Sequence, residues 1–145
     1  MLSYFNTYGV RSSVFSFGFV THKATQDMGA HIRWENHIPD KQHFLTIDKT
    51  IGWADPAQGG VPIVTHLHGA EVQSSSDGHP EAWFTPSGET GPTYLGQNYT
   101  YPNNQPPALL WYHDHTIGIT RLNVVSGLAG MYIITSEQEK QLGLP

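Results

Sequence analysis

The sequence predicts an all-β protein, folded as a Greek-key sandwich or barrel. Two observations favour this class. Apolar and β-branched runs recur along the chain, bounded by Gly, Pro, Asn and Asp, which is typical of strands joined by turns. The 145 residues include 15 Gly and 10 Pro, and only 13% are charged, a balance that favours short strands over amphipathic helices.

Seven strands are expected, in order along the chain. Each is a short run rich in Val, Ile, Phe, Tyr, Trp or Thr that ends at a turn-forming residue. The predicted strands cover residues 13–20, 31–36, 43–47, 63–68, 98–101, 108–113 and 130–135. A long segment rich in Ser, Gly and Pro, residues 69–96, separates the fourth strand from the fifth, and loops of that length are more often functional than incidental.

A short helix is expected at the C-terminus. Ser136 is followed three residues later by Glu139, the spacing of a capping box, so residues 137–142 are predicted to be helical, with Gly143 ending the helix. The length favours a single domain covering residues 1–145, because one core of ordinary size accounts for a chain of this length.

The composition excludes several classes of function. The net charge of -5 and the lack of a Lys/Arg cluster argue against a nucleic-acid partner. No apolar stretch approaches the roughly 18 residues of a membrane helix, so no membrane partner is expected. No signal peptide is visible, which leaves the localisation unassigned. The chain has no Cys, which excludes disulfides and thiolate metal sites within it.

Two His-x-His pairs carry the chemical signal: His66 with His68, and His113 with His115. Nine His in this length give about 0.5 such pairs by chance, so composition alone does not decide the matter. In a strand, residues two apart share a face, about 6.6 Å apart at Cα. The four imidazoles would therefore converge if the two predicted strands were neighbours. Imidazole suits copper and zinc, and an all-His site favours copper, with zinc as a possible substitute.

The remaining five His fit an ordinary role in hydrogen bonding and are left unassigned. They are His22, His31, His37, His43 and His79.

These motifs resemble the multicopper oxidase family, in its laccase, bilirubin oxidase and spore-coat laccase branch. The resemblance rests on Thr-His-Leu-His-Gly at 65–69 and Trp-Tyr-His-Asp-His at 111–115. It extends through Ser-Asp-Gly at 76–78, Pro-Glu-Ala-Trp-Phe at 80–84, Thr-Gly-Pro at 90–92, Tyr-Pro-Asn at 101–103, Thr-Arg-Leu-Asn at 120–123 and Gly-Leu-Ala-Gly at 127–130.

The resemblance implies a cupredoxin-like domain, equivalent to the first of three in those enzymes. By similarity, His66 would bind the type 2 copper, while His68, His113 and His115 would bind the type 3 pair. Together they would form half of the trinuclear cluster that reduces dioxygen to water. Asp77 resembles the acid that assists proton delivery, although it could equally be a turn residue ahead of Gly78. Asp114 is expected to face away from copper and to hydrogen-bond locally.

The resemblance also implies what this chain lacks. In the family, a Cys-containing type 1 site and the other four cluster histidines lie in the last domain, so the present chain resembles a truncated or isolated first domain. A lone monomer is not expected to turn over as a laccase. A complementary cupredoxin domain or further copies of the chain in a homo-oligomer would supply the other half. The electron donor would be a small phenolic or dye-like molecule.

Three functions therefore remain open. The first is a laccase-like copper oxidoreductase domain, active only with a partner. The second is a non-catalytic or promiscuous metal-binding module. The third is a structural domain whose histidines hold no metal. Hydrolysis is disfavoured because the chain has no Gly-x-Ser-x-Gly, His-Glu-x-x-His or Cys nucleophile.

Overall fold

The computed structural model describes residues 2–7, 10–15, 20–39, 42–56 and 59–143, which form eight strands in two four-stranded sheets. The first sheet has the order β2-β1-β4-β6, and all its pairings are antiparallel. Its strands are β1 (Leu2–Thr7), β2 (Val10–Phe15), β4 (Ala30–Glu35) and β6 (Asn98–Tyr101).

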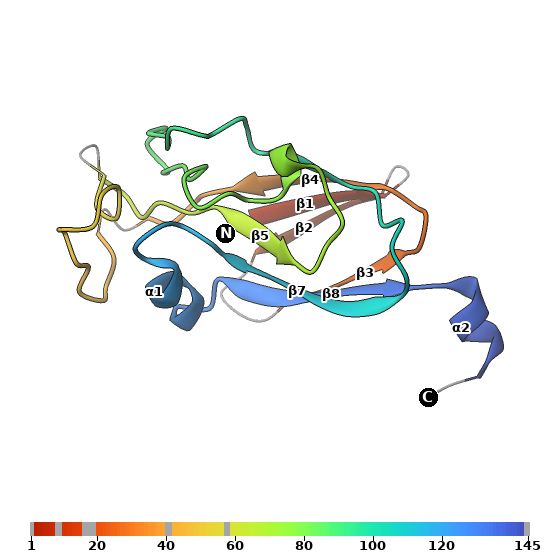
Figure 1. Ribbon diagram of the computed structural model, residues 1–145. Coiled ribbons are helices and arrows are strands. Elements are labelled where there is room, and N and C mark those ends of the chain that lie inside the picture. The colour runs from red at the N-terminus through yellow and green to blue at the C-terminus, as the bar shows by residue number, and fades with distance from the viewer. Residues whose placement is uncertain (1, 8–9, 16–19, 40–41, 57–58, 144–145) are drawn as a thin grey trace.

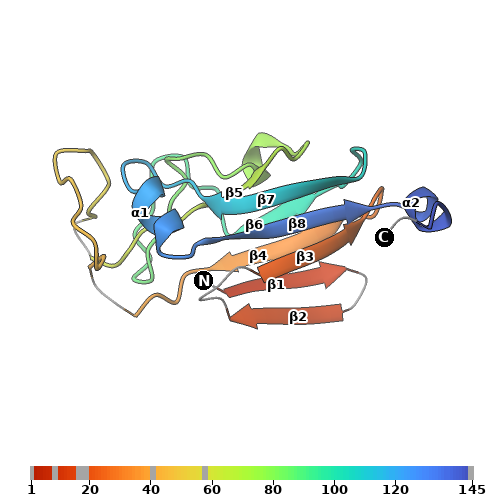
Figure 2. The same ribbon diagram turned by 90° about the horizontal axis from the view of Figure 1, so that it is seen from below.

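The second sheet carries both histidine pairs. Its order is β3-β8-β7-β5, with β3 parallel to β8 and the other pairings antiparallel. Its strands are β3 (Val20–Thr25), β5 (Thr65–His68), β7 (Ala108–Asp114) and β8 (Ala129–Thr135). Helix α1 (Thr120–Val125) lies at one end of the sandwich and α2 (Glu137–Gln141) at the opposite end (Figures 1 and 2).

The core lies between the two sheets. On β4 the residues alternate between buried and exposed, so that Ile32 and Trp34 are almost fully buried. The ring of Trp34 lies 5.5 Å from that of Tyr112 on β7, and Tyr101 on β6 lies 5.8 Å from Tyr132 on β8. These contacts join one sheet to the other, as in a sandwich. The predicted all-β class is confirmed.

Five of the seven predicted strands correspond to observed strands, with boundaries shifted by at most two residues: those at 31–36, 63–68, 98–101, 108–113 and 130–135. The strand predicted over 13–20 is wrong as a single element. Its first residues end β2 in one sheet and its last residue begins β3 in the other, while residues 16–19 lie outside the described part of the chain. A continuous apolar run cannot reveal a change of sheet within it.

The strand predicted over 43–47 is also wrong, because this segment has no regular structure. Its alternating apolar residues serve a second, smaller hydrophobic cluster instead. Leu45 and Ile47 pack against Ile119 and Leu122, which belong to the segment around α1. The alternation correctly indicates that one side of this segment is buried. That side packs against a helix and loops, however, and not beside a paired strand.

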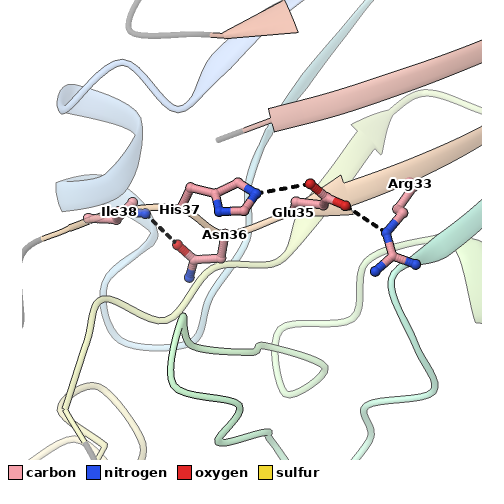
Figure 3. Close-up of polar contacts among 5 residues, drawn as sticks. All are labelled: Arg33, Glu35, Asn36, His37 and Ile38. Carbon is pink, nitrogen blue, oxygen red and sulfur yellow. Dashed lines mark hydrogen bonds and ion pairs between the residues drawn. The ribbon is translucent and has the colours of Figure 1, made fainter. Parts of the chain in front are cut away.

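The chain leaving β4 is fixed by polar contacts (Figure 3). Glu35 accepts hydrogen bonds from Arg33 and His37 at the surface, and the His37 bond, with that of Arg33, lowers the pKa of Glu35. The next residue, Asn36, is buried and donates to the carbonyls of Val61 and Phe84, at 2.8 and 3.0 Å. Asn36 therefore ties the end of β4 to the segment that leads into β5.

The predicted C-terminal helix is confirmed, one residue shorter than expected. Ser136 accepts a hydrogen bond from the Glu139 amide, and the Glu139 carboxylate accepts one from the Ser136 amide, which completes the capping box.

No helix among the described residues is long and apolar enough to cross a membrane. The single-domain assignment to residues 1–145 stays a prediction.

His22 on β3 gives a prediction about stability and pH. Burial lowers its pKa from 6.5 to about 4, and its ring lies 5.5 Å from Tyr112, which stays neutral because burial raises its pKa to about 12. The unfolded chain then binds this proton more readily, so stability is full above pH 6.5 and falls as the pH drops towards about 4. The full shift corresponds to about 3 kcal/mol, at about 1.4 kcal/mol per pKa unit.

The measurement is urea unfolding across that pH range for the wild type and for His22→Phe, which keeps an aromatic ring beside Tyr112. The variant should lose less stability on acidification. Equal losses in both proteins would show that His22 does not set the pH dependence.

Candidate metal centre

The pairing of β5 with β7 brings the two histidine pairs together. His66 lies directly opposite His113, and His68 lies opposite Trp111. On β7, Leu109 and Trp111 are exposed on the same face as the imidazole of His113, while Leu110 and Tyr112 point into the core. The prediction that the pairs share a face on neighbouring strands is confirmed.

The four rings form two triangles that share one edge. This edge joins His66 and His113, whose ring centroids lie 5.5 Å apart. His68 lies 5.6 and 5.5 Å from these two rings, and His115 lies 5.2 and 5.5 Å from them. All four predicted ligands therefore converge, although His115 lies just beyond the end of β7 rather than within it.

Backbone carbonyls fix the direction of the two central rings. The Nδ1–H of His66 donates to the carbonyl of Asp77 at 2.6 Å, and that of His113 donates to the carbonyl of Asp114 at 2.7 Å. In a neutral imidazole this leaves Nε2 as the nitrogen with a free lone pair. Histidines that bind metals almost always donate their other N–H in this way.

The donor atoms fit a metal ion. Nδ1 of His68 lies 3.3 Å from Nε2 of His113, and two nitrogens bound tetrahedrally to one ion at about 2.0 Å lie about 3.3 Å apart. One ligand atom from each of His66, His68 and His113 falls within 4.8 Å of the others. Nδ1 of His115 is buried without a hydrogen-bond partner. Burial lowers the pKa of His113, which favours the neutral, metal-binding form.

The buried carboxylate of Asp114 links the two segments that carry the histidine pairs. Asp114 is 1% exposed. Its carboxylate accepts hydrogen bonds from the amides of Val64 and Thr116, both at 3.0 Å, and from the Thr116 hydroxyl at 2.9 Å. Burial raises the pKa of Asp114 to about 6, against the effect of these bonds. The predicted local bonding is present, but the bond to Val64, two residues before His66, spans 50 positions in the sequence.

Asp77 lies beside Nδ1 of His66, the ring nitrogen opposite the proposed metal-binding Nε2. Its carboxylate Oδ1 is 3.4 Å from His66 Nδ1, the nitrogen that already donates to the Asp77 carbonyl, and the side chain is about half exposed. A residue this close to His66 and to solvent could pass protons towards the site. That role stays a prediction.

Trp111 forms one wall of the site. Its ring stacks on His68 at 5.5 Å and lies 4.2 Å from His113, while 37% of the residue remains exposed. In the sequence this residue stands out only as part of the Trp-Tyr-His-Asp-His motif at 111–115. Its position opposite His68 follows from the strand register, which the sequence does not supply.

Four of the five unassigned histidines make hydrogen bonds away from this centre. His31 bonds Thr100, His37 bonds Glu35, His43 bonds the Leu45 amide and Ser126, and His79 bonds the Glu81 amide and Thr93. Among the described residues, the only group of three or more candidate ligands is His66, His68 and His113.

Comparison with known proteins identifies the family of the chain. The sequence model of the multicopper oxidase family matches residues 58–139. The chain is 44% identical over 140 residues to the multicopper oxidase LPR1 homolog 1 of Oryza sativa subsp. japonica, covering 95% of this chain and 24% of that protein. It is 45% identical over 128 residues to the laccase of Bacillus subtilis (strain 168), covering 86% of this chain and 25% of that protein.

The fold is also shared with solved structures. A laccase from Pediococcus acidilactici superposes with a TM-score of 0.65 at 24% identity, over 93% of this chain and 23% of that one, which supports the cupredoxin-like fold. The chain spans about a quarter of the length of the curated relatives it matches. By its matched sequence model and by identities above 40% across most of its length, the chain belongs to the multicopper oxidase family.

Proposed function

We propose that this chain supplies half of a trinuclear copper site, with His66 at the type 2 position and His68, His113 and His115 at the type 3 pair. The convergence of four imidazoles, two of them oriented by backbone carbonyls, carries the proposal. Membership of the multicopper oxidase family supports copper as the metal, with zinc as a substitute. When bound, copper would supply the redox chemistry by which dioxygen is reduced to water.

The chain's own residues would bind and orient the metal and deliver protons. His66 and His113 present Nε2, because Nδ1 is held by a carbonyl in each. Asp77 would bring protons from solvent to the site, since its carboxylate lies 3.4 Å from His66 and is about half exposed. Reduction of dioxygen consumes protons, so a titratable group at this point has a chemical purpose.

The remaining ligands would come from a complementary cupredoxin domain or from a second copy of the chain. Leu109 is 66% exposed and Trp111 37% exposed on the histidine-bearing face of β7, which supports an apolar contact there. A small phenolic or dye-like donor would deliver electrons through a type 1 site outside these 145 residues, since they include no Cys.

The test is a copper titration of the chain, followed by metal-edge diffraction or absorption on the loaded protein. We expect copper bound through imidazole nitrogens of the four histidines, with zinc competing for the same site. Copper held elsewhere, or no saturable binding, would overturn the proposal.

A non-catalytic metal-binding module is the second candidate. The three donor atoms within 4.8 Å of one another suffice to hold one ion without a partner. Dioxygen uptake with a phenolic donor, measured with and without a complementary domain, separates the two functions. Light scattering with copper quantitation, on the chain incubated with copper, tests self-association: a strict monomer that holds no copper excludes the oligomeric site.

A further inference from the structure

The segment from Ser76 to Gly78 lies close against β5. Gly78 has a φ of +78°, and a Cβ placed on it would lie 2.0 Å from the carbonyl oxygen of Thr65 and 2.9 Å from the Cα of His66. Real Cβ atoms do not make such contacts. The obstructing atoms belong to the backbone of a paired strand, so they cannot rotate away. Glycine is therefore required here for the segment to approach His66.

This approach puts the Asp77 carbonyl 2.6 Å from Nδ1 of His66. The same segment is held from its other side, because the Ser76 hydroxyl accepts a hydrogen bond from the Thr100 amide on β6 at 3.0 Å. β5 and β6 are edge strands of different sheets. The segment thus joins two sheet edges and presents one carbonyl to one histidine.

We infer that Gly78 is a positioning residue for His66: by allowing the close approach, it lets the Asp77 carbonyl hold Nδ1–H and so fixes Nε2 as the metal-binding nitrogen. The inference rests on the proposed function, since it concerns one ligand of the same site. The fixed tautomer and ring direction raise metal affinity because the ligand does not have to reorient on binding.

The test compares Gly78→Ala with Gly88→Ala. Gly88 also has a positive φ, +90°, but nothing lies within 4 Å of a Cβ placed on it. Both variants therefore carry the cost of alanine in a left-handed conformation, and only one carries the clash. We expect Gly78→Ala to bind copper(II) about 10–100-fold more weakly, with altered copper hyperfine splitting in electron paramagnetic resonance, and Gly88→Ala to match the wild type in both.

Circular dichroism establishes that both variants fold. If the two glycine variants fold and show equal affinities and spectra, the inference is overturned. Ser76→Ala provides a milder displacement of the same segment, and we expect a smaller loss of affinity in the same direction.

A measurement without metal keeps the inference falsifiable if Gly78→Ala does not fold. Nitrogen NMR of the metal-free wild type at mildly alkaline pH should show His66 protonated at Nδ1. An Nε2–H tautomer would overturn the inference. Failure of the wild type to bind copper would instead overturn the proposed function, because the tautomer of His66 is measured independently of copper.

Discussion

Replacing His113 with alanine should reduce copper affinity at least about 100-fold, since even partners of metal ligands contribute about 10–100-fold. His113 lies at the centre of the site: its Nε2 is 3.3 Å from His68 Nδ1, and its ring lies about equally far from those of His66 and His115. Replacing His113 removes one proposed ligand. It also removes the ring that lies next to all three of the other histidines. Competition titration with a copper(II) chelator measures the change.

His79→Ala is the matched control. His79 is exposed on the loop that follows β5, and it bonds the Glu81 amide rather than another histidine. We expect its copper affinity to stay within about twofold of the wild type, because its ring bonds the Glu81 amide and the Thr93 hydroxyl and none of the proposed ligands. A comparable loss in both variants would mean that copper binds surface imidazoles without a defined centre.

The sharing of one strand face by each histidine pair could be predicted from the sequence because it depends on a local rule. Residues two apart share a face of a strand, so each pair is fixed wherever a strand forms. The sequence did not supply the register that puts His66 opposite His113 or the stacking of Trp111 on His68. Both depend on strand pairing across more than 40 residues, which no local pattern encodes.

The backbone contact that orients His66 could not be predicted from the sequence either. The sequence indicates a role for the carboxylate of Asp77, whereas its backbone carbonyl makes the 2.6 Å bond to His66. Every residue has a backbone carbonyl, so the sequence does not indicate which carbonyl contacts a histidine. The Gly after Asp77 was the available clue, since a Ser-Asp-Gly turn predicts a positive φ without indicating what lies against it.

The fold was predicted at the level of class and less well at the level of elements. On β4, β5 and β6 buried residues alternate with more exposed ones, and the sequence of β4 shows this period. The segment 43–47 shows the same alternation yet packs against Ile119 and Leu122 beside α1. Helix α1 itself was not predicted, because six residues without a side-chain cap give no clear signal.

Asp114→Ala should lower the free energy of unfolding by about 2–5 kcal/mol, because it breaks a buried hydrogen-bond network. The substitution leaves the amides of Val64 and Thr116 without the acceptor they share, and each buried unpaired group costs about 1–3 kcal/mol. Because the bond to Val64 holds the start of β5 beside β7, copper affinity should fall as well. Urea unfolding and copper titration measure the two effects.

Asp48 offers an unusually close control for that variant. Its carboxylate accepts hydrogen bonds from the amide and hydroxyl of Thr50, two residues later, just as Asp114 does from Thr116, but Asp48 is exposed. The two sites share the hydrogen bonds from the Thr two residues later and differ in burial and in the bond to Val64. Asp48→Ala should therefore change stability by about 0.5 kcal/mol or less. If Asp114→Ala were equally mild, water would be reaching the freed amides, and the two histidine pairs would be held together by the strand ladder and not by the carboxylate.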